Sequence, residues 1–215
     1  MTDAVTTARL QDWLRRAAQA LSENADYLTQ LDSAIGDADH GTNMNRGFTA
    51  VTAKLDASAP ADIPALFKTV GMTLISSVGG ASGPLYGTLF LEMGKNSPAG
   101  EEMNAADLEK ALRAGVAGVV ARGHAEAGDK TMIDAFEPAL EALSASVASG
   151  GSAAEAVTAA AEAAKKGSDA TEPLVARKGR ASYLGERSAG HIDPGSVSTT
   201  ILLRTLGEAL TESAG

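Results

Sequence analysis

Apolar side chains recur at intervals of three or four residues along almost the whole chain, which is the spacing of one face of an α-helix. The stripes are Trp13, Ala17 and Leu21; Met44, Phe48, Val51 and Leu55; Ile63, Phe67, Val70 and Leu74; Leu85, Leu89 and Met93; Leu108, Leu112, Val116 and Val119; and Met132, Phe136, Leu140, Leu143 and Val147. The alanine-rich residues 152–178 and the segment from Val197 to Leu210 predict two more helices. No segment alternates convincingly between apolar and polar residues, so the pattern predicts an all-α fold of about eight helices.

The loops between these helices are short and rich in Gly, Pro and Asp, which favours antiparallel neighbours. Asn104 precedes the stripe that begins at Leu108, and Asp107 lies three residues after Asn104, the spacing of an N-cap residue and its N3 partner. The chain has 215 residues, of which 44% are hydrophobic, so we expect a single domain over residues 1–215 with a sizeable core.

Charge and cysteine content narrow the possible functions. A net charge of −9 and a pI near 4.8 argue against nucleic acid or an anionic membrane as the main partner. The chain has no cysteine, which excludes disulfides and thiolate metal sites and is typical of the cytoplasm. The sequence contains neither a signal-peptide pattern nor an apolar run long enough for a membrane span, so we expect a cytoplasmic protein.

Three carboxylates and an imidazole crowd the stretch between the first two stripes. Asp32, Asp37 and Asp39 are followed directly by His40. Carboxylates this close repel one another unless cations offset their charge, and their oxygens suit Mg²⁺ or Ca²⁺. An EF-hand beginning at Asp37 fails, because its fifth position is Gly41 and its twelfth is a phenylalanine. Mg²⁺ with a bound phosphate fits better; the alternative is that the aspartates only cap a helix or form turns.

Three further loops carry candidate ligand contacts. Residues 79–84 are small, could bring a ligand close to the backbone, and offer Ser82 as a helix cap. Residues 123–131 resemble a P-loop, but Asp129 separates the glycine from the lysine and no strand precedes it, so that interpretation fails. Gly123 and Met132 could still line a nucleotide pocket. The loop 176–187 has four cations, one of which could bind a phosphate, although a solvated basic loop is equally compatible.

Four segments carry a resemblance to a known family. They read LDSAIGDADHGTNMNRGF, SSVGGASGPLYG, GDKTM and ARKGRASYLGERSAGHIDPG, within residues 31–195. Together with the rest of the chain they resemble the ADP-binding L subunit of dihydroxyacetone kinase. That resemblance implies a closed barrel of eight up-and-down helices with the nucleotide at one end. One departure is Ala38, where many relatives have glycine, so the loop must tolerate a Cβ.

The resemblance also implies the ligand set. Asp32, Asp37 and Asp39 are expected to bind two Mg²⁺ ions that bridge to the phosphates of ADP or ATP. Three aspartates and ADP carry a charge of roughly −6, which two Mg²⁺ ions lower to about −2. The expected nucleotide contacts are His40, Gly41, Thr42, Asn43, Ala81, Ser82, Gly123, Met132, Arg180, Asp193, Pro194 and Gly195. No catalytic residue is certain; Arg180 is the candidate for electrostatic stabilisation of the transferred phosphoryl group.

The function implied by the resemblance is a phosphoryl relay between partner subunits. An M subunit with a phosphohistidine, part of the phosphoenolpyruvate-dependent phosphotransferase system, would convert bound ADP to ATP. The phosphoryl group would then pass to dihydroxyacetone held by a K subunit. Two alternatives remain open: the nucleotide module of an ATP-dependent ketose kinase, for example for erythrulose, or a nucleotide-loaded regulator that binds a transcription factor.

Overall fold

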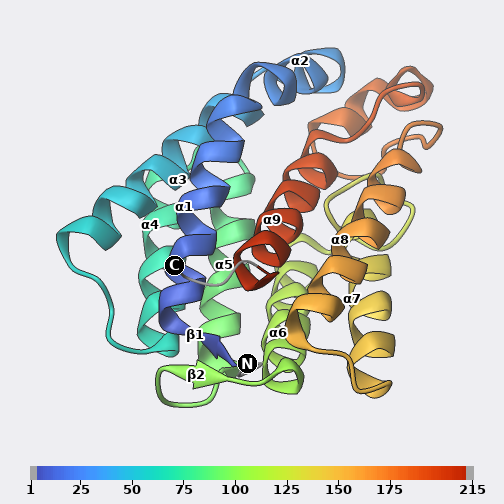
Figure 1. Cartoon of the computed structure of the whole chain (residues 1–215). Coiled ribbons are helices and arrows are strands. Elements are labelled where there is room, and N and C mark those ends of the chain that lie inside the picture. The colour runs from blue at the N-terminus through green and yellow to red at the C-terminus, as the bar shows by residue number, and fades with distance from the viewer. Residues whose placement is uncertain (1–3, 212–215) are drawn as a thin grey trace.

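The computed structural model describes residues 4–211, which fold almost entirely into helices (Figure 1). This confirms the predicted all-α class. In chain order the elements are β1 (Val5–Thr6), α1 (Thr7–Glu23), α2 (Ala25–Ile35), α3 (His40–Ala57), α4 (Ile63–Ser77), α5 (Ser82–Asn96), β2 (Glu102–Met103), α6 (Ala105–Gly123), α7 (Ile133–Ala148), α8 (Ala153–Asp169), the 3₁₀ element η1 (Arg180–Ser188) and α9 (Pro194–Thr211). The strands β1 and β2 form an antiparallel pair, two residues long on each side, which was not predicted because two residues are too few to show a period of two.

The long helices contact one another in a continuous cycle. Each of α3 to α8 packs on the next helix, and α9 and α3 both pack on α1, which completes the cycle. Helix α2 stands outside it and packs on α3 and α9 at one end of the molecule, while the strand pair lies at the opposite end (Figure 1). Because successive helices in the cycle run antiparallel, the starts of α3, α5, α7 and α9 are all at the end that carries α2.

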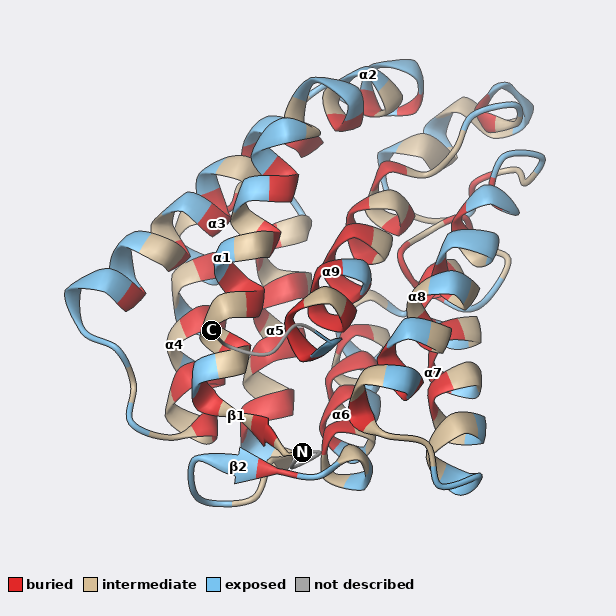
Figure 2. Cartoon of the chain, viewed as in Figure 1, coloured by how far each residue is buried: buried red, intermediate tan, exposed pale blue. Residues whose placement is uncertain are grey.

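The predicted stripes form the core. Red buried residues line the inward faces of the helices in Figure 2. The ring of Phe90 lies at the centre of an aromatic group, 5.7 Å from Trp13, 6.1 Å from Phe67 and 6.4 Å from Phe48 between ring centroids. The indole Nε1 of Trp13 donates to the carbonyl of Leu202 at 2.9 Å, so the only polar atom of this ring is satisfied inside the core.

Helix boundaries follow local capping, and two of them correct the sequence analysis. The Asn104–Asp107 capping box is present as expected. The helix predicted over 152–178 ends at Asp169, because the chain turns at residues 170–173 through short-range hydrogen bonds and Pro173 cannot continue a helix. Asp32 was placed in a loop between helices, but it lies in the last turn of α2, a helix whose short apolar face went unnoticed.

Glycines let α4 and α5 approach closely. A Cβ added to Gly71 of α4 would lie 2.7 Å from the carbonyl oxygen of Gly87 and 2.7 Å from Leu91 Cγ, both on α5. Gly115 makes the equivalent contact between α6 and α5, where a Cβ would lie 2.8 Å from the carbonyl oxygen of Leu89. These backbone contacts fix the separation of helices whose ends carry the loop 78–81.

We therefore expect Gly71→Ala to destabilise the protein by about 1–3 kcal/mol, because overpacking outweighs the higher helix propensity of alanine. Gly207→Ala in α9 is the matched control: its Cβ would meet Thr158 at an ordinary 3.5 Å, so this variant should gain about 0.5–1 kcal/mol. Urea denaturation followed by circular dichroism measures both. Equal effects of the two substitutions would contradict the close packing of α4 on α5.

Candidate functional site

Four helix N-termini converge around one cavity. It has a volume of about 200 Å³ and is lined by the end of α2, the loops before α3, α5, α7 and α9, and the start of η1. The N-terminal turns and the positive ends of four helix dipoles therefore face the same space. Such an arrangement favours an anion.

The three predicted metal ligands meet at this cavity. One carboxylate oxygen from each of Asp32, Asp37 and Asp39 lies within 4.8 Å of the others. Asp32 is buried, and its Oδ2 accepts the backbone N–H groups of Asp39 at 2.8 Å and His40 at 3.1 Å. This carboxylate thus orders the first turn of α3 and leaves its other oxygen available. Three convergent carboxylates are the donor set of a hard divalent cation, so these residues fit Mg²⁺.

The loop that joins α2 to α3 has a strained and a crowded position. Ala38 adopts a left-handed conformation with φ of 60°, where most L-residues pay a steric penalty. Gly36 lies so close to Asp32 that any Cβ there would overlap Oδ1 of the carboxylate. The tight turn at these two positions is what brings Asp37 and Asp39 back over Asp32.

His40 is held by hydroxyl groups on both ring nitrogens. Nε2 lies 2.9 Å from Ser198 Oγ, and Nδ1 lies 3.2 Å from Ser82 Oγ. Burial lowers the pKa of His40, although Asp32 and Asp39 act to raise it. Ser82 was expected to cap α5, but its hydroxyl makes no cap bond and faces the imidazole instead.

A buried tyrosine extends this network into the core. The hydroxyl of Tyr86 lies 2.7 Å from Ser198 Oγ and 3.1 Å from both Thr199 Oγ1 and the carbonyl oxygen of Gly195. Burial raises the pKa of Tyr86, so this phenol stays protonated. Sequence reasoning missed Tyr86, Ser198 and Thr199, although a run of hydroxyl residues on an otherwise apolar helix was the available signal.

Arg180 contacts the carboxylate cluster directly. Its Nε lies 2.8 Å from Asp37 Oδ2, with the side chains 67% and 37% exposed. An ion pair this exposed contributes only about 0–1 kcal/mol, so Arg180 can exchange Asp37 for another anion at little cost. The basic residue of the loop that was expected to meet phosphate therefore stands at the open side of the cavity.

Asp193 begins α9 as its N-cap. The carboxylate accepts the N–H of Ser196 at 2.6 Å, and Asp193, Pro194 and Gly195 all line the cavity. Burial raises the pKa of Asp193 to about 7, an effect that the Ser196 hydrogen bond partly opposes.

A second cavity of about 300 Å³ adjoins the first and is more apolar. Its walls include Leu85, Val119, Ile133 and Gly123. Met132 and Ala81 line both cavities, so the carboxylate site and the apolar space share a wall.

Three of the expected nucleotide contacts are not among the residues that line the two cavities. Gly41, Thr42 and Asn43 line neither of these two cavities among the described residues. Gly41 abuts the carbonyl of Ala25 at the crossing of α3 and α2, and Asn43 Oδ1 accepts a hydrogen bond from Arg46 Nη2 at 2.6 Å. These three residues follow the aspartates in the sequence but do not face the same space, because successive side chains of a helix point about 100° apart.

Fold and site together define an all-helical domain that gathers a carboxylate cluster and an apolar cavity at one end. The chain belongs to the DAK2 domain family, whose sequence profile matches residues 34–208. It is 46% identical over 209 residues to the PEP-dependent dihydroxyacetone kinase, ADP-binding subunit DhaL, of Escherichia coli (strain K12), covering 97% of this chain and 100% of that protein. It is 42% identical to the PTS-dependent dihydroxyacetone kinase, ADP-binding subunit DhaL, of Lactococcus lactis, covering 93% and 95%.

A solved structure shares the fold. The crystal structure of the dihydroxyacetone kinase from C. freundii in complex with AMP-PNP and Mg²⁺ matches with a TM-score of 0.72 and 25% identity. The match covers 94% of this chain but only 34% of that longer chain. Within residues 4–211, no helix is both long and apolar enough to cross a membrane.

The strain at Ala38 gives a testable prediction. Ala38→Gly should stabilise the protein by about 0.5–1 kcal/mol, because relief of the left-handed penalty exceeds the greater backbone entropy of glycine in the unfolded chain. Ala50→Gly in the middle of α3, where the backbone is helical, should instead cost about 0.5–1 kcal/mol. Thermal unfolding in the presence of a chelator compares the two, and a loss at both positions would show that Ala38 is unstrained.

Proposed function

We propose that this chain binds ADP and ATP with two Mg²⁺ ions and serves as the nucleotide subunit of a dihydroxyacetone kinase. The observation that carries the proposal is the shared wall between the carboxylate cavity and the apolar cavity at Met132 and Ala81. A nucleotide has the same two halves: a charged diphosphate that needs cations and a flat base that needs an apolar slot. The names of the relatives support the choice of ADP.

The diphosphate would lie in the carboxylate cavity. Asp32, Asp37 and Asp39 would hold the two Mg²⁺ ions, which supply the positive charge that lets phosphates and carboxylates share one site. The N-termini of α3, α5, α7 and α9 add oriented N–H groups. Arg180 would leave Asp37 for a phosphate oxygen, since the metal replaces it as the partner of that carboxylate.

The adenine would lie in the apolar cavity between Leu85, Val119 and Met132. Gly123 borders this space, and a Cβ there would already lie 3.2 Å from Leu85 Cδ2, so a larger residue would narrow the slot. His40 and Ser82 line the carboxylate cavity. The neutral imidazole and the hydroxyl suit hydrogen bonds to phosphate or ribose oxygens.

The donor and the acceptor of the phosphoryl group would come from partner subunits. An oxygen of the β-phosphate of bound ADP would attack the phosphorus of a phosphohistidine on an M subunit, so that the P–N bond breaks, ATP forms and the histidine of the M subunit is released. No residue of this chain would be phosphorylated. The γ-phosphoryl would then pass to dihydroxyacetone on a K subunit. Arg180 and Asp37, both solvent-accessible, mark the open side by which each partner could reach the phosphates. The names of the relatives, which specify PEP or PTS dependence, favour this donor over free ATP.

Asp37→Asn tests the nucleotide site. Loss of one metal-ligating charge should lower the affinity for MgADP by at least about tenfold, since even indirect metal contacts are worth that much. The fold should persist, because Asp37 is exposed and, unlike Asp32, accepts no backbone hydrogen bond that orders α3. Asp56→Asn, which removes an exposed carboxylate paired with Arg15, is the control and should bind normally. Titration calorimetry at fixed Mg²⁺ measures both variants; unchanged affinity in Asp37→Asn would rule out this metal site.

The relay predicts that ADP behaves as a retained coenzyme. Release requires several metal–oxygen contacts to break together, so ADP should stay with the protein through gel filtration in Mg²⁺ and should be lost on chelation. A phosphohistidine donor should convert labelled, bound ADP to ATP without its exchange into an unlabelled pool. If the label exchanges within one turnover and free ATP sustains phosphorylation of dihydroxyacetone with the K subunit alone, the chain is the module of an ATP-consuming kinase instead.

A further inference from the structure

The segment between α8 and α9 is a long loop, residues 171–193. Its two ends, residues 171–176 and 188–193, are bonded to each other and are called the neck here. Its two ends lie side by side: the N–H of Gly190 donates to the carbonyl of Glu172 at 2.7 Å, and the N–H of Asp193 donates to Thr171 Oγ1 at 3.0 Å. Further along, the N–H of Ala176 donates to Ser188 Oγ at 2.8 Å. The tip of this loop, residues 177–187, carries Arg180 to the carboxylate cluster.

The ammonium group of Lys130 lies inside this neck. Its Nζ donates to the carbonyl oxygens of Thr171 at 2.8 Å, Leu174 at 3.1 Å and Glu172 at 3.3 Å on the entering side of the loop. It also donates to the carbonyl oxygen of His191 on the leaving side. Lys130 is 1% exposed and, in the described part of the chain, forms no ion pair.

Lys130 itself projects from a rigid turn. The carboxylate of Asp134 accepts the N–H groups of Gly128 at 2.5 Å and Thr131 at 2.7 Å, and Asp129 accepts that of Glu126 at 2.9 Å. The carbonyl of Asp129 in turn accepts the N–H of Arg177 at 3.0 Å. The turn leads directly into α7, so the backbone of Lys130 is anchored to the helices, while its ammonium group and the carbonyl of Asp129 both bind the loop.

A set of neutral carbonyl oxygens around one buried cation is the chemistry by which proteins replace the hydration shell of a monovalent ion. A buried ammonium group is costly unless such acceptors surround it. The structure of the neck therefore depends on the positive charge of the ammonium group between these carbonyls. The methylene groups of Lys130 serve only to place that charge.

We propose that Lys130 is a positioning residue, a tethered monovalent cation that holds the neck of the loop 171–193 closed and thereby places Arg180 and Asp193 at the cavity. The placement of those two residues matters for nucleotide binding only if the proposed function holds; the closed neck does not depend on it. No direct contact of Lys130 with a ligand is required, because its ammonium group is fully engaged with the loop carbonyls.

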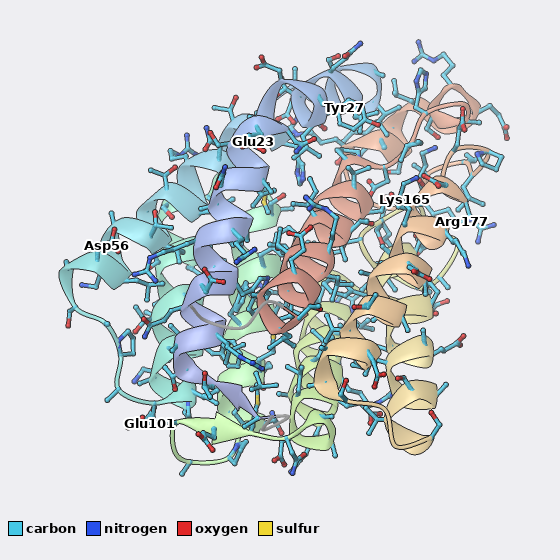
Figure 3. The ribbon with its side chains drawn as sticks, viewed as in Figure 1. Glu23, Tyr27, Asp56, Glu101, Lys165 and Arg177 are labelled. Atoms are coloured by element: carbon cyan, nitrogen blue, oxygen red, sulfur yellow. The ribbon has the colours of Figure 1, made fainter. Side chains whose placement is uncertain are left out.

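The loop tip contains its own probe for the test. Arg177, Arg180 and Arg187 are exposed sites for trypsin, and Arg177 lies on the outer side of the molecule near α8 (Figure 3). Although these side chains are exposed, trypsin cuts only where the backbone around the bond opens transiently, so the cleavage rate reports how often the loop opens. Lys130→Met keeps an apolar stem of similar length without the charge, and Lys130→Ala removes the stem beyond Cβ. Lys110→Ala, an exposed lysine of α6, is the control.

Without nucleotide, we expect trypsin to cut the loop of Lys130→Met and Lys130→Ala about tenfold faster or more than that of the unmodified protein and of Lys110→Ala, while helical circular dichroism is retained. Propylammonium, which has the atoms missing from Lys130→Ala, should restore resistance in that variant alone. Propanol, of the same shape without charge, should not. Calorimetry with MgADP should show weaker binding in both Lys130 variants and recovery with propylammonium.

Equal trypsin resistance of Lys130→Met and the unmodified protein would overturn the proposal, since the charge would then be dispensable. Rescue by propanol as effective as by propylammonium would overturn it as well, because packing alone would account for the neck. If the unmodified protein binds no MgADP, the proposed function fails, whereas the trypsin rates still decide whether Lys130 closes the loop.

Discussion

The antiparallel order of neighbouring helices is the constraint on which the site depends. Because α3, α5, α7 and α9 start at the same end, the positive ends of their dipoles face one space. That positive field makes it possible for three carboxylates to gather there. Close backbone contacts at Gly71 and Gly115 set the spacing of the helices, so the geometry of the cavity is determined well inside the core.

Most of the fold was predictable from periodicity, because each long helix buries one continuous apolar face. The Asn104 cap was also readable, since a capping box is local. Helix α2 was missed because it is short and its inward face holds Asp32 where an apolar residue was expected. The end of α8 was misplaced because alanine content was followed past Pro173, which cannot continue a helix, whereas the backbone after Asp169 turns through three-residue hydrogen bonds.

The candidate site was only partly predictable. The three aspartates meet as expected because the turn at Gly36 and Ala38 is built within a few residues. The partners of His40 come from α5 and α9, which lie 42 and 158 positions away in the sequence, so no local pattern could identify Ser198. Lys130 was considered only as part of a failed P-loop pattern; its actual surroundings, four carbonyls of another loop, exist only in the folded chain.

The double anchoring of His40 also restricts how phosphoryl groups can travel. A histidine that carries phosphate needs a ring nitrogen whose lone pair can reach the donor. Both nitrogens of His40 face hydroxyl groups, and the residue is 8% exposed. Rotation of the ring would break contacts to two helices at once. His40 is thus a fixed side chain beside the phosphate space and does not become a phosphohistidine in this arrangement. A phosphoryl group is then carried through the site only by a bound ligand.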